Sequence, residues 1–131
     1  MPIVDVTEAT WDSLVVDNPL PVLVEFWAPW CGACKAMEPI LKSLATRLNG
    51  KVAVARVESA ERGLLRRYSV RYLPSFAVVW LAHPDTMLVG VVSEAHMLRW
   101  LEDHLRIPLG AMLQPPQSLI GARSVLIVEE D

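Results

Sequence analysis

The fold of this chain is decided by one stretch, Val22-Leu23-Val24-Glu25-Phe26-Trp27-Ala28-Pro29-Trp30-Cys31-Gly32-Ala33-Cys34, which holds both of its cysteines. Aliphatic and aromatic residues run from 22 to 27 and break off at Pro29, which predicts a buried strand. Residues 33–48 then place their apolar side chains at helical spacing and Gly50 follows, so a helix is expected there. Because the two thiols lie at a strand end and a helix start, we interpret them as a redox pair.

The position of Cys31 at a predicted helix N-terminus favours its thiolate. Unpaired amides and the positive end of the helix dipole lower a thiol pKa in such motifs to about 7 from roughly 8.5. Cys34 lies one turn further, close enough to close a short disulfide ring. The alternative is a zinc site, but structural zinc normally takes four Cys or His ligands. The other candidate ligands are His83, His96 and His104, which lack the partner spacing, so no metal site is predicted.

Residues 24–35 resemble the active-site signature of the thioredoxin family. Pro39 matches the proline that kinks the active-site helix of that family. Residues 72–76 resemble the stretch that carries its cis-proline, and residues 89–91 resemble the glycine strand that completes its substrate groove. The resemblance covers roughly residues 3–106 and implies the thioredoxin fold, an α/β fold with a central mixed β-sheet of about five strands flanked by four helices.

The resemblance also implies an activity and a site. It implies a protein-disulfide reductase, a thiol–disulfide oxidoreductase in which Cys31 attacks a substrate disulfide and Cys34, assisted by Glu25 as proton acceptor, releases the reduced product. The substrate-binding residues that it implies are Trp30, Gly32, Ala33, Leu73, Pro74, Val89, Gly90 and Val91. It implies no cofactor beyond the Cys31–Cys34 disulfide, and disulfide-containing proteins as substrates. An NADPH-dependent thioredoxin reductase is the implied electron donor, hence a role in electron transport and cell redox homeostasis.

Two residues of the site depart from the family pattern. Ala33 replaces the usual proline between the cysteines, and Glu25 replaces a buried aspartate. A carboxylate in an apolar strand has a raised pKa when it is buried, whereas the period-two pattern of a strand leaves its exposure open. Arg56 stands where relatives often carry a lysine. It either holds Glu25 ionised and lowers its pKa, or faces solvent at a strand end.

The remaining elements follow from hydrophobic periodicity and capping residues. We expect strands over 3–6, 52–57, 76–81 and 87–92, a helix carrying Trp11, Leu14 and Val15 with Thr7 as its cap, and a helix from about Ala60 to Arg67 capped by Ser59. Ser93 is expected to cap a final helix with the apolar stripe Met97, Leu98, Leu101 and Leu105. The last two strands are close enough for an antiparallel hairpin, whose turn at 82–86 holds His83 as an exposed residue. Three tryptophans fall in apolar runs and are predicted to be core: Trp11, Trp80 and Trp100.

Composition excludes several functions. The chain has 131 residues, the size of one compact domain, and its formal net charge of −3 gives no electrostatic footprint for nucleic acid. Arg62, Arg66, Arg67 and Arg71 cluster in the sequence; a solvated face is the first interpretation and docking of an anion or a partner is the second.

The longest uncharged apolar stretch has ten residues, whereas about 20 are needed to span a bilayer. No signal-peptide pattern is found, so the predicted location is the cytoplasm, without membrane association.

Residues 107–131 match nothing in the family core and form a predicted C-terminal extension to a thioredoxin domain over residues 1–106. Prolines and a glycine favour a linker over 107–117, and residues 124–128 are typical of a strand. That strand either docks on a sheet edge, including that of another copy in self-association, or belongs to a loosely ordered end. The extension and the apolar content of 53% support an alternative function, a thioredoxin-fold chaperone or partner-binding subunit. A disulfide oxidant or isomerase is a third hypothesis, disfavoured by the missing signal peptide.

Overall fold

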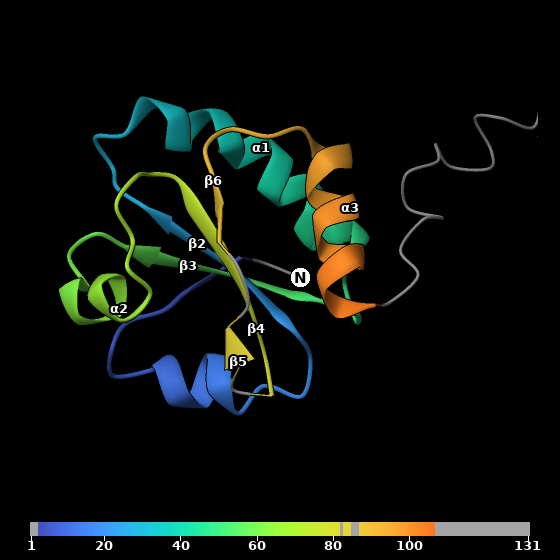
Figure 1. Ribbon diagram of the computed structural model, residues 1–131, viewed down its shortest axis with the longest axis horizontal. Coiled ribbons are helices and arrows are strands. Elements are labelled where there is room, and N and C mark those ends of the chain that lie inside the picture. The colour runs from blue at the N-terminus through green and yellow to red at the C-terminus, as the bar shows by residue number, and fades with distance from the viewer. Residues whose placement is uncertain (1–2, 82, 85–86, 107–131) are drawn as a thin grey trace, which may run out of the picture.

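The structure, a computed structural model, describes residues 3–81, 83–84 and 87–106 and centres on a mixed β-sheet (Figure 1). Its strands are β1 (Val4–Asp5), β2 (Val22–Trp27), β3 (Ala53–Glu58), β4 (Ser75–Trp80), β5 (His83–Pro84) and β6 (Leu88–Val89). β3 pairs in parallel with β1 and with β2, while β4 is antiparallel to β2 and also pairs with β5 and β6. The predicted mixed sheet is therefore confirmed, with β5 as a short strand that the sequence pattern did not predict.

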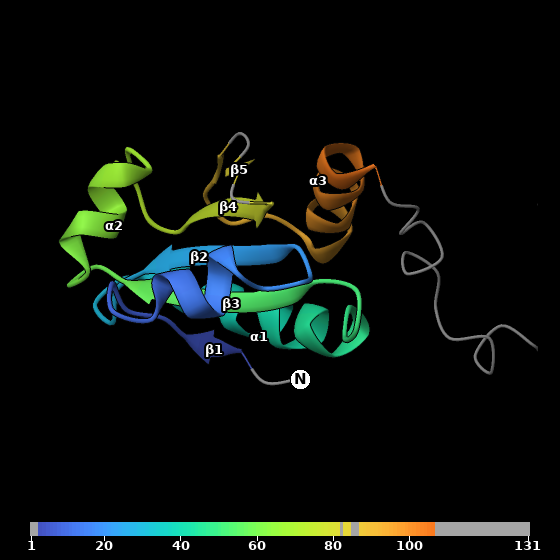
Figure 2. The same ribbon diagram turned by 90° about the horizontal axis from the view of Figure 1, so that it is seen from below.

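Helices cover both faces of this sheet. The described residues form the π-helix η1 (Asp12–Val16) and the α-helices α1 (Gly32–Arg47), α2 (Arg62–Arg67) and α3 (Glu94–Leu105). Side chains of α1 and α3 share one core with the sheet, and those of η1 and α2 belong to a second core on the opposite face. Figure 2 shows η1 in front of the sheet and α1 behind it. None of the helices in the described part of the chain is long and apolar enough to cross a membrane.

The register of β2 decides which face each of its side chains occupies. Val24 and Phe26 belong to the core under η1 and α2, whereas Leu23 belongs to the core under α1 and α3. Since side chains alternate along a strand, Glu25 shares the α1 face with Leu23. Glu25 lies opposite Arg56 in the parallel pairing with β3. The sheet thus places a carboxyl and a guanidinium group side by side on the face that α1 covers.

The two short helices begin later than the capping residues predicted. Thr7 does not cap η1; its hydroxyl contacts that of Thr10, and no side chain caps the helix start at Trp11. Ser59 does not cap α2 either: the helix begins at Arg62, with Glu61 in the N-cap position, and the Glu8 carboxylate, 55 residues away in the sequence, accepts a hydrogen bond from the Gly63 N–H. Both predicted caps were therefore wrong. The Thr7 hydroxyl contacts Thr10, and the amide at the start of α2 is bound by Glu8.

The hairpin after β4 also differs from its prediction. The expected strand over 87–92 is reduced to Leu88–Val89, and Gly90 directly after it has a φ of +97°, which favours glycine. His83 lies in β5, paired with Trp80, instead of in a turn. Trp11 is buried as predicted, whereas Trp80 and Trp100 are only half-buried. The predicted linker, terminal strand and extension lie outside the described residues.

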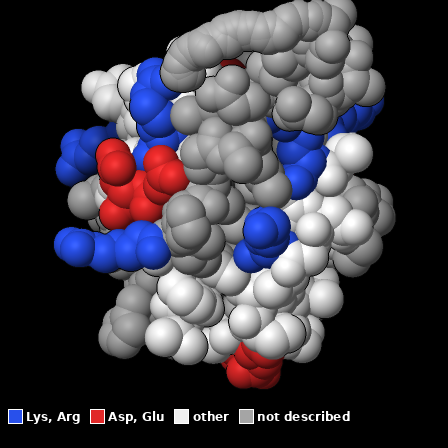
Figure 3. All heavy atoms as spheres, turned by 90° about the vertical axis from the view of Figure 1, so that its right-hand side faces the viewer, with Lys and Arg blue, Asp and Glu red and all other residues white. Residues whose placement is uncertain are grey.

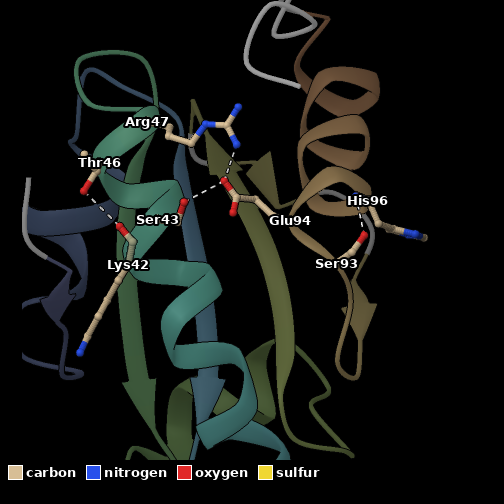
Figure 4. Close-up of polar contacts among 7 residues, drawn as sticks. All are labelled: Lys42, Ser43, Thr46, Arg47, Ser93, Glu94 and His96. Atoms are coloured by element: carbon tan, nitrogen blue, oxygen red, sulfur yellow. Dashed lines mark hydrogen bonds and ion pairs between the residues drawn. The ribbon is translucent and has the colours of Figure 1, made fainter. Parts of the chain in front are cut away.

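A polar contact joins the end of α1 to the start of α3, as Figure 4 shows. Glu94 Oε2 accepts a hydrogen bond of 2.9 Å from Ser43 Oγ and forms an ion pair with Arg47. Ser93 caps α3 as predicted, since its hydroxyl accepts the backbone N–H of His96 at 3.1 Å. This contact fixes the end of α1 that lies farthest from the cysteines.

Candidate active site

Cys31 and Cys34 form a disulfide at the N-terminus of α1. Cys31 is the N-cap residue in an extended conformation, and its Sγ accepts the backbone N–H of Cys34 at 3.1 Å. Cys31 is 7% exposed and Cys34 is 2% exposed. In the reduced protein the same amide and the helix dipole stabilise negative charge on Cys31. The predicted placement of the pair at a strand end and a helix start is confirmed.

Apolar side chains and the segment around Pro74 surround the disulfide. Ala28 and the two cysteines form a buried cluster against which Trp27 and Leu73 pack. The Leu73–Pro74 peptide bond is cis, and the Gly90 N–H donates to the Pro74 carbonyl at 2.9 Å. The segment after β6 is therefore held beside the segment that contacts the cysteines.

The predicted substrate-binding residues differ in their exposure. Trp30 is 75% exposed, and the side chains of Val89 and Val91 are also exposed. Gly32 and Ala33 are exposed in the first turn of α1, while Pro74 is buried. A methyl group added at Gly32 meets no atom within 4 Å apart from its chain neighbours and its own helix, so the space beside Gly32 is open.

Glu25 is a buried acid, only 1% exposed. Burial raises its pKa from 4.5 to about 7; the positive charge of Arg56 opposes this effect, and the negative charge of Glu38 adds to it. Glu25 Oε1 forms an ion pair with Arg56 Nε at 3.4 Å, and Glu25 Oε2 has no hydrogen-bond partner within the described part of the chain. The effect of burial on the Glu25 pKa is therefore larger than that of the Arg56 charge. The strand pattern left the exposure of Glu25 open, and the structure shows that it is buried.

Arg56 connects this acid to the surroundings of the cysteines. Its guanidinium group lies 3.7 Å from the centre of the Trp27 ring, a cation–π contact. Its Nη2 also lies 4.0 Å from Glu38 Oε2, on a side chain that is 45% exposed. Arg56 thus contacts two carboxylates and the ring that packs against the disulfide, instead of facing solvent at a strand end.

Sequence reasoning missed two members of this arrangement, Glu38 and Trp27. Helical spacing was the available signal for Glu38, because a residue four positions after Cys34 shares its side of α1. Trp27 was assigned to a buried strand without its role as the surface on which Arg56 stacks. Within the described residues no group of three or more His, Cys, Asp or Glu side chains could hold a metal ion.

The family model described as thioredoxin matches residues 2–103. The chain belongs to the thioredoxin family. It is 35% identical over 101 residues to thioredoxin 1 of Nostoc sp., covering 76% of this chain and 94% of that protein. The thioredoxin of Synechocystis sp. is 33% identical over 101 residues, with the same two shares. The chloroplastic thioredoxin M-type of Spinacia oleracea is 31% identical over 102 residues, covering 77% of this chain and 56% of that protein.

Family membership and the disulfide together establish the activity. The protein is a thiol–disulfide oxidoreductase that reduces protein disulfides by dithiol–disulfide exchange through Cys31 and Cys34. The alternative of a chaperone or partner-binding subunit is not favoured. Thioredoxins act on disulfide-containing proteins, need no cofactor beyond their redox-active disulfide, and are typically reduced by a thioredoxin reductase.

Proposed function

We propose that Cys31 is the attacking thiolate, Cys34 the resolving thiol, and Glu25 the group that accepts the proton of Cys34. The Cys31 thiolate attacks a sulfur of the substrate disulfide, which forms a mixed disulfide and expels one substrate thiolate. The Cys34 thiolate then attacks Cys31 Sγ, which closes the Cys31–Cys34 disulfide and expels the second substrate thiolate. Two electrons pass from the dithiol to the substrate, and each expelled thiolate takes up a proton from its surroundings.

The observation that carries the role of Glu25 is a buried carboxyl group whose pKa is raised to about 7. A general base is most effective when its pKa lies near the working pH. The strand register supports the assignment, because it places Glu25 on the face of the sheet that α1 covers, and α1 carries Cys34. Glu25 Oε2 accepts no hydrogen bond within the described residues, which leaves an oxygen able to take a proton.

We further infer that an extended substrate segment lies along Trp30, Gly32 and Ala33 on one side and Leu73, Pro74 and residues 89–91 on the other. Exposure of Trp30, Val89 and Val91 supports this groove, since apolar side chains on a surface are available to a partner. The bond from the Gly90 amide to the Pro74 carbonyl supports a groove of fixed shape.

For the electron donor we propose an NADPH-dependent thioredoxin reductase, supported by the family to which the chain belongs. For the location we propose a reducing compartment such as the cytoplasm, because a dithiol that reduces substrates must itself be kept reduced.

Single-turnover kinetics with a disulfide-bonded peptide test the assigned roles. Cys34→Ser stops the reaction at the mixed disulfide and reports the attack step alone, whereas Cys31→Ser forms no mixed disulfide. Glu25→Gln, compared with the wild type, is expected to slow release of the mixed disulfide by about tenfold or more at pH 7. In the Cys34→Ser variant, the additional change Glu25→Gln is expected to leave the rate of attack by Cys31 nearly unchanged. Equal slowing of attack and release contradicts the role given to Glu25.

A further inference from the structure

A cleft beside α2 is lined by three arginines. Its lining residues are Arg62, Leu65, Arg66, Ser69, Val70 and Arg71, and its volume is about 420 Å³. We call it the arginine cleft. Arg62 and Arg66 are four residues apart and so lie on one side of α2, while Arg71 comes from the segment that follows the helix. The cleft therefore combines guanidinium groups with a hydroxyl and two apolar side chains.

The three cleft arginines carry positive charge that the described residues leave unpaired. Arg47 and Arg56 form ion pairs with carboxylates, but no such ion pair involves Arg62, Arg66 or Arg71 within the described ranges. Two acidic side chains at the start of α2 accept hydrogen bonds from backbone amides, Glu8 from Gly63 and Glu61 from Glu8, and neither forms an ion pair with these arginines within the described residues. Figure 3 shows a different pattern on the face that carries α3, where basic and acidic side chains are intermixed.

One end of the arginine cleft, at Arg71, is close along the chain to the site of disulfide exchange. Arg71 is two residues before Leu73, which packs against the two cysteines, so the chain between them spans at most about 7 Å. Tyr72, between them, is exposed. A substrate segment that passes Tyr72 would therefore reach the cleft at Arg71.

The chemistry of the arginine cleft fits carboxylates. Phosphate sites commonly use backbone amides at a helix start, but the Gly63 amide at the start of α2 is taken by Glu8. The cleft instead offers side-chain guanidinium groups, each of which can bind a carboxylate through two parallel hydrogen bonds. Three such groups spread between residues 62 and 71 suit several carboxylates along a chain better than one compact anion.

We propose that the arginine cleft binds a carboxylate-rich segment of the substrate protein while the substrate disulfide reacts at Cys31. This inference rests on the proposed groove and names the substrate class that it prefers. The carboxylates speed the encounter by electrostatic attraction and hold the substrate in register, without taking part in the exchange of sulfur atoms. Selection among disulfides then depends on charge beside the disulfide as well as on its accessibility.

Two synthetic peptides with the same disulfide loop test the proposal. One carries runs of aspartate beside the loop and the other carries asparagine, which has nearly the same shape and no charge. The wild type is expected to reduce the aspartate peptide with a kcat/KM about three- to tenfold higher at low salt, the gain given by one or two exposed ion pairs. The preference is expected to disappear near 1 M salt, where the screening length is about 3 Å.

Matched variants locate the effect. Arg66→Glu is expected to abolish the preference, while Arg99→Glu, the same change of charge on α3, is expected to keep it. Figure 1 shows α2 and α3 at opposite ends of the molecule. Arg71→Gln, a milder change, is expected to reduce the preference without reversing it.

Three results overturn the arginine cleft proposal: equal kcat/KM for the two peptides, a preference that survives in Arg66→Glu, or one that Arg99→Glu removes equally. The asparagine peptide reports the proposed groove and cysteine roles separately, because it carries no charge for the cleft to bind. If the wild type reduces neither peptide, the proposed function itself fails.

Discussion

Replacing Glu25 by glutamine is expected to change how the stability of the protein depends on pH. The carboxyl group has a pKa of about 7 in the folded protein and 4.5 in its ordinary state. At about 1.4 kcal/mol for each pKa unit, ionising this buried group costs the folded state about 3 kcal/mol.

The direction in which the free energy of unfolding changes with pH follows from which state binds the proton more tightly. Below pH 4.5 Glu25 is protonated in both the folded and the unfolded chain, so its full contribution to stability is present. Between pH 4.5 and 7 the unfolded chain loses the proton first, and the free energy of unfolding falls as pH rises. Above pH 7 both states are ionised and the loss is complete. Glutamine does not titrate, so this part of the pH dependence is absent from Glu25→Gln.

Urea unfolding of the oxidised wild type and of Glu25→Gln between pH 4 and 8.5 measures this difference. The free energy of unfolding of the variant minus that of the wild type is expected to increase with pH by about 3 kcal/mol, most steeply between pH 5 and 7. The ion pair with Arg56 forms only when Glu25 is ionised, so its effect is already contained in the pKa of about 7. A difference that stays constant over this range refutes the reasoning, because it shows that the Glu25 pKa is the same in the folded and the unfolded protein.

Two further predictions concern the neighbours of Glu25 and of the cysteines. Arg56→Met keeps an aliphatic contact with Trp27 but removes the charge that lowers the Glu25 pKa. The same stability difference, measured between Arg56→Met and Arg56→Met with Glu25→Gln, is therefore expected to go on rising above pH 7, where it levels off when Arg56 is present. A difference that levels off at the same pH in both backgrounds contradicts the role of Arg56. Ala33→Pro is tolerated in the first turn of α1 and removes a backbone N–H donor near the sulfurs, which destabilises the reduced thiolate. The reduction potential, measured in glutathione buffers, is expected to fall toward the value of about −270 mV of a prolyl thioredoxin, and a value that stays or rises contradicts it.

Local pattern was sufficient for the elements that carry the cysteines. The apolar run before Pro29 predicted β2 with its observed bounds, and the helical spacing after Cys31 predicted α1 within one residue at each end. These signals are strong because β2 is buried on both faces and α1 buries one side against the sheet. Periodicity also predicted the other long strands and helices, whereas the cis bond before Pro74 was implied only by the family resemblance.

Contacts between distant residues explain what the pattern missed. Burial of Glu25 depends on α1 covering one face of the sheet, and its contact with Arg56 depends on the parallel register of β2 and β3. Neither can be read from the sequence around residue 25. The start of α2 depends in the same way on Glu8, which lies far from it in the sequence. Local capping signals cannot predict a cap that arrives from another part of the fold.

The short strands at the sides of the sheet have a consequence for turnover. Within the described residues, the path of paired strands ends at β1 and β5, each only two residues long, and β5 contains Pro84. A long, regular edge would let an extended chain add itself as a further strand through many backbone hydrogen bonds. The few bonds available here keep such pairing weak. Once its disulfide is reduced, an unfolded product can leave quickly, and the surface is free for the next substrate.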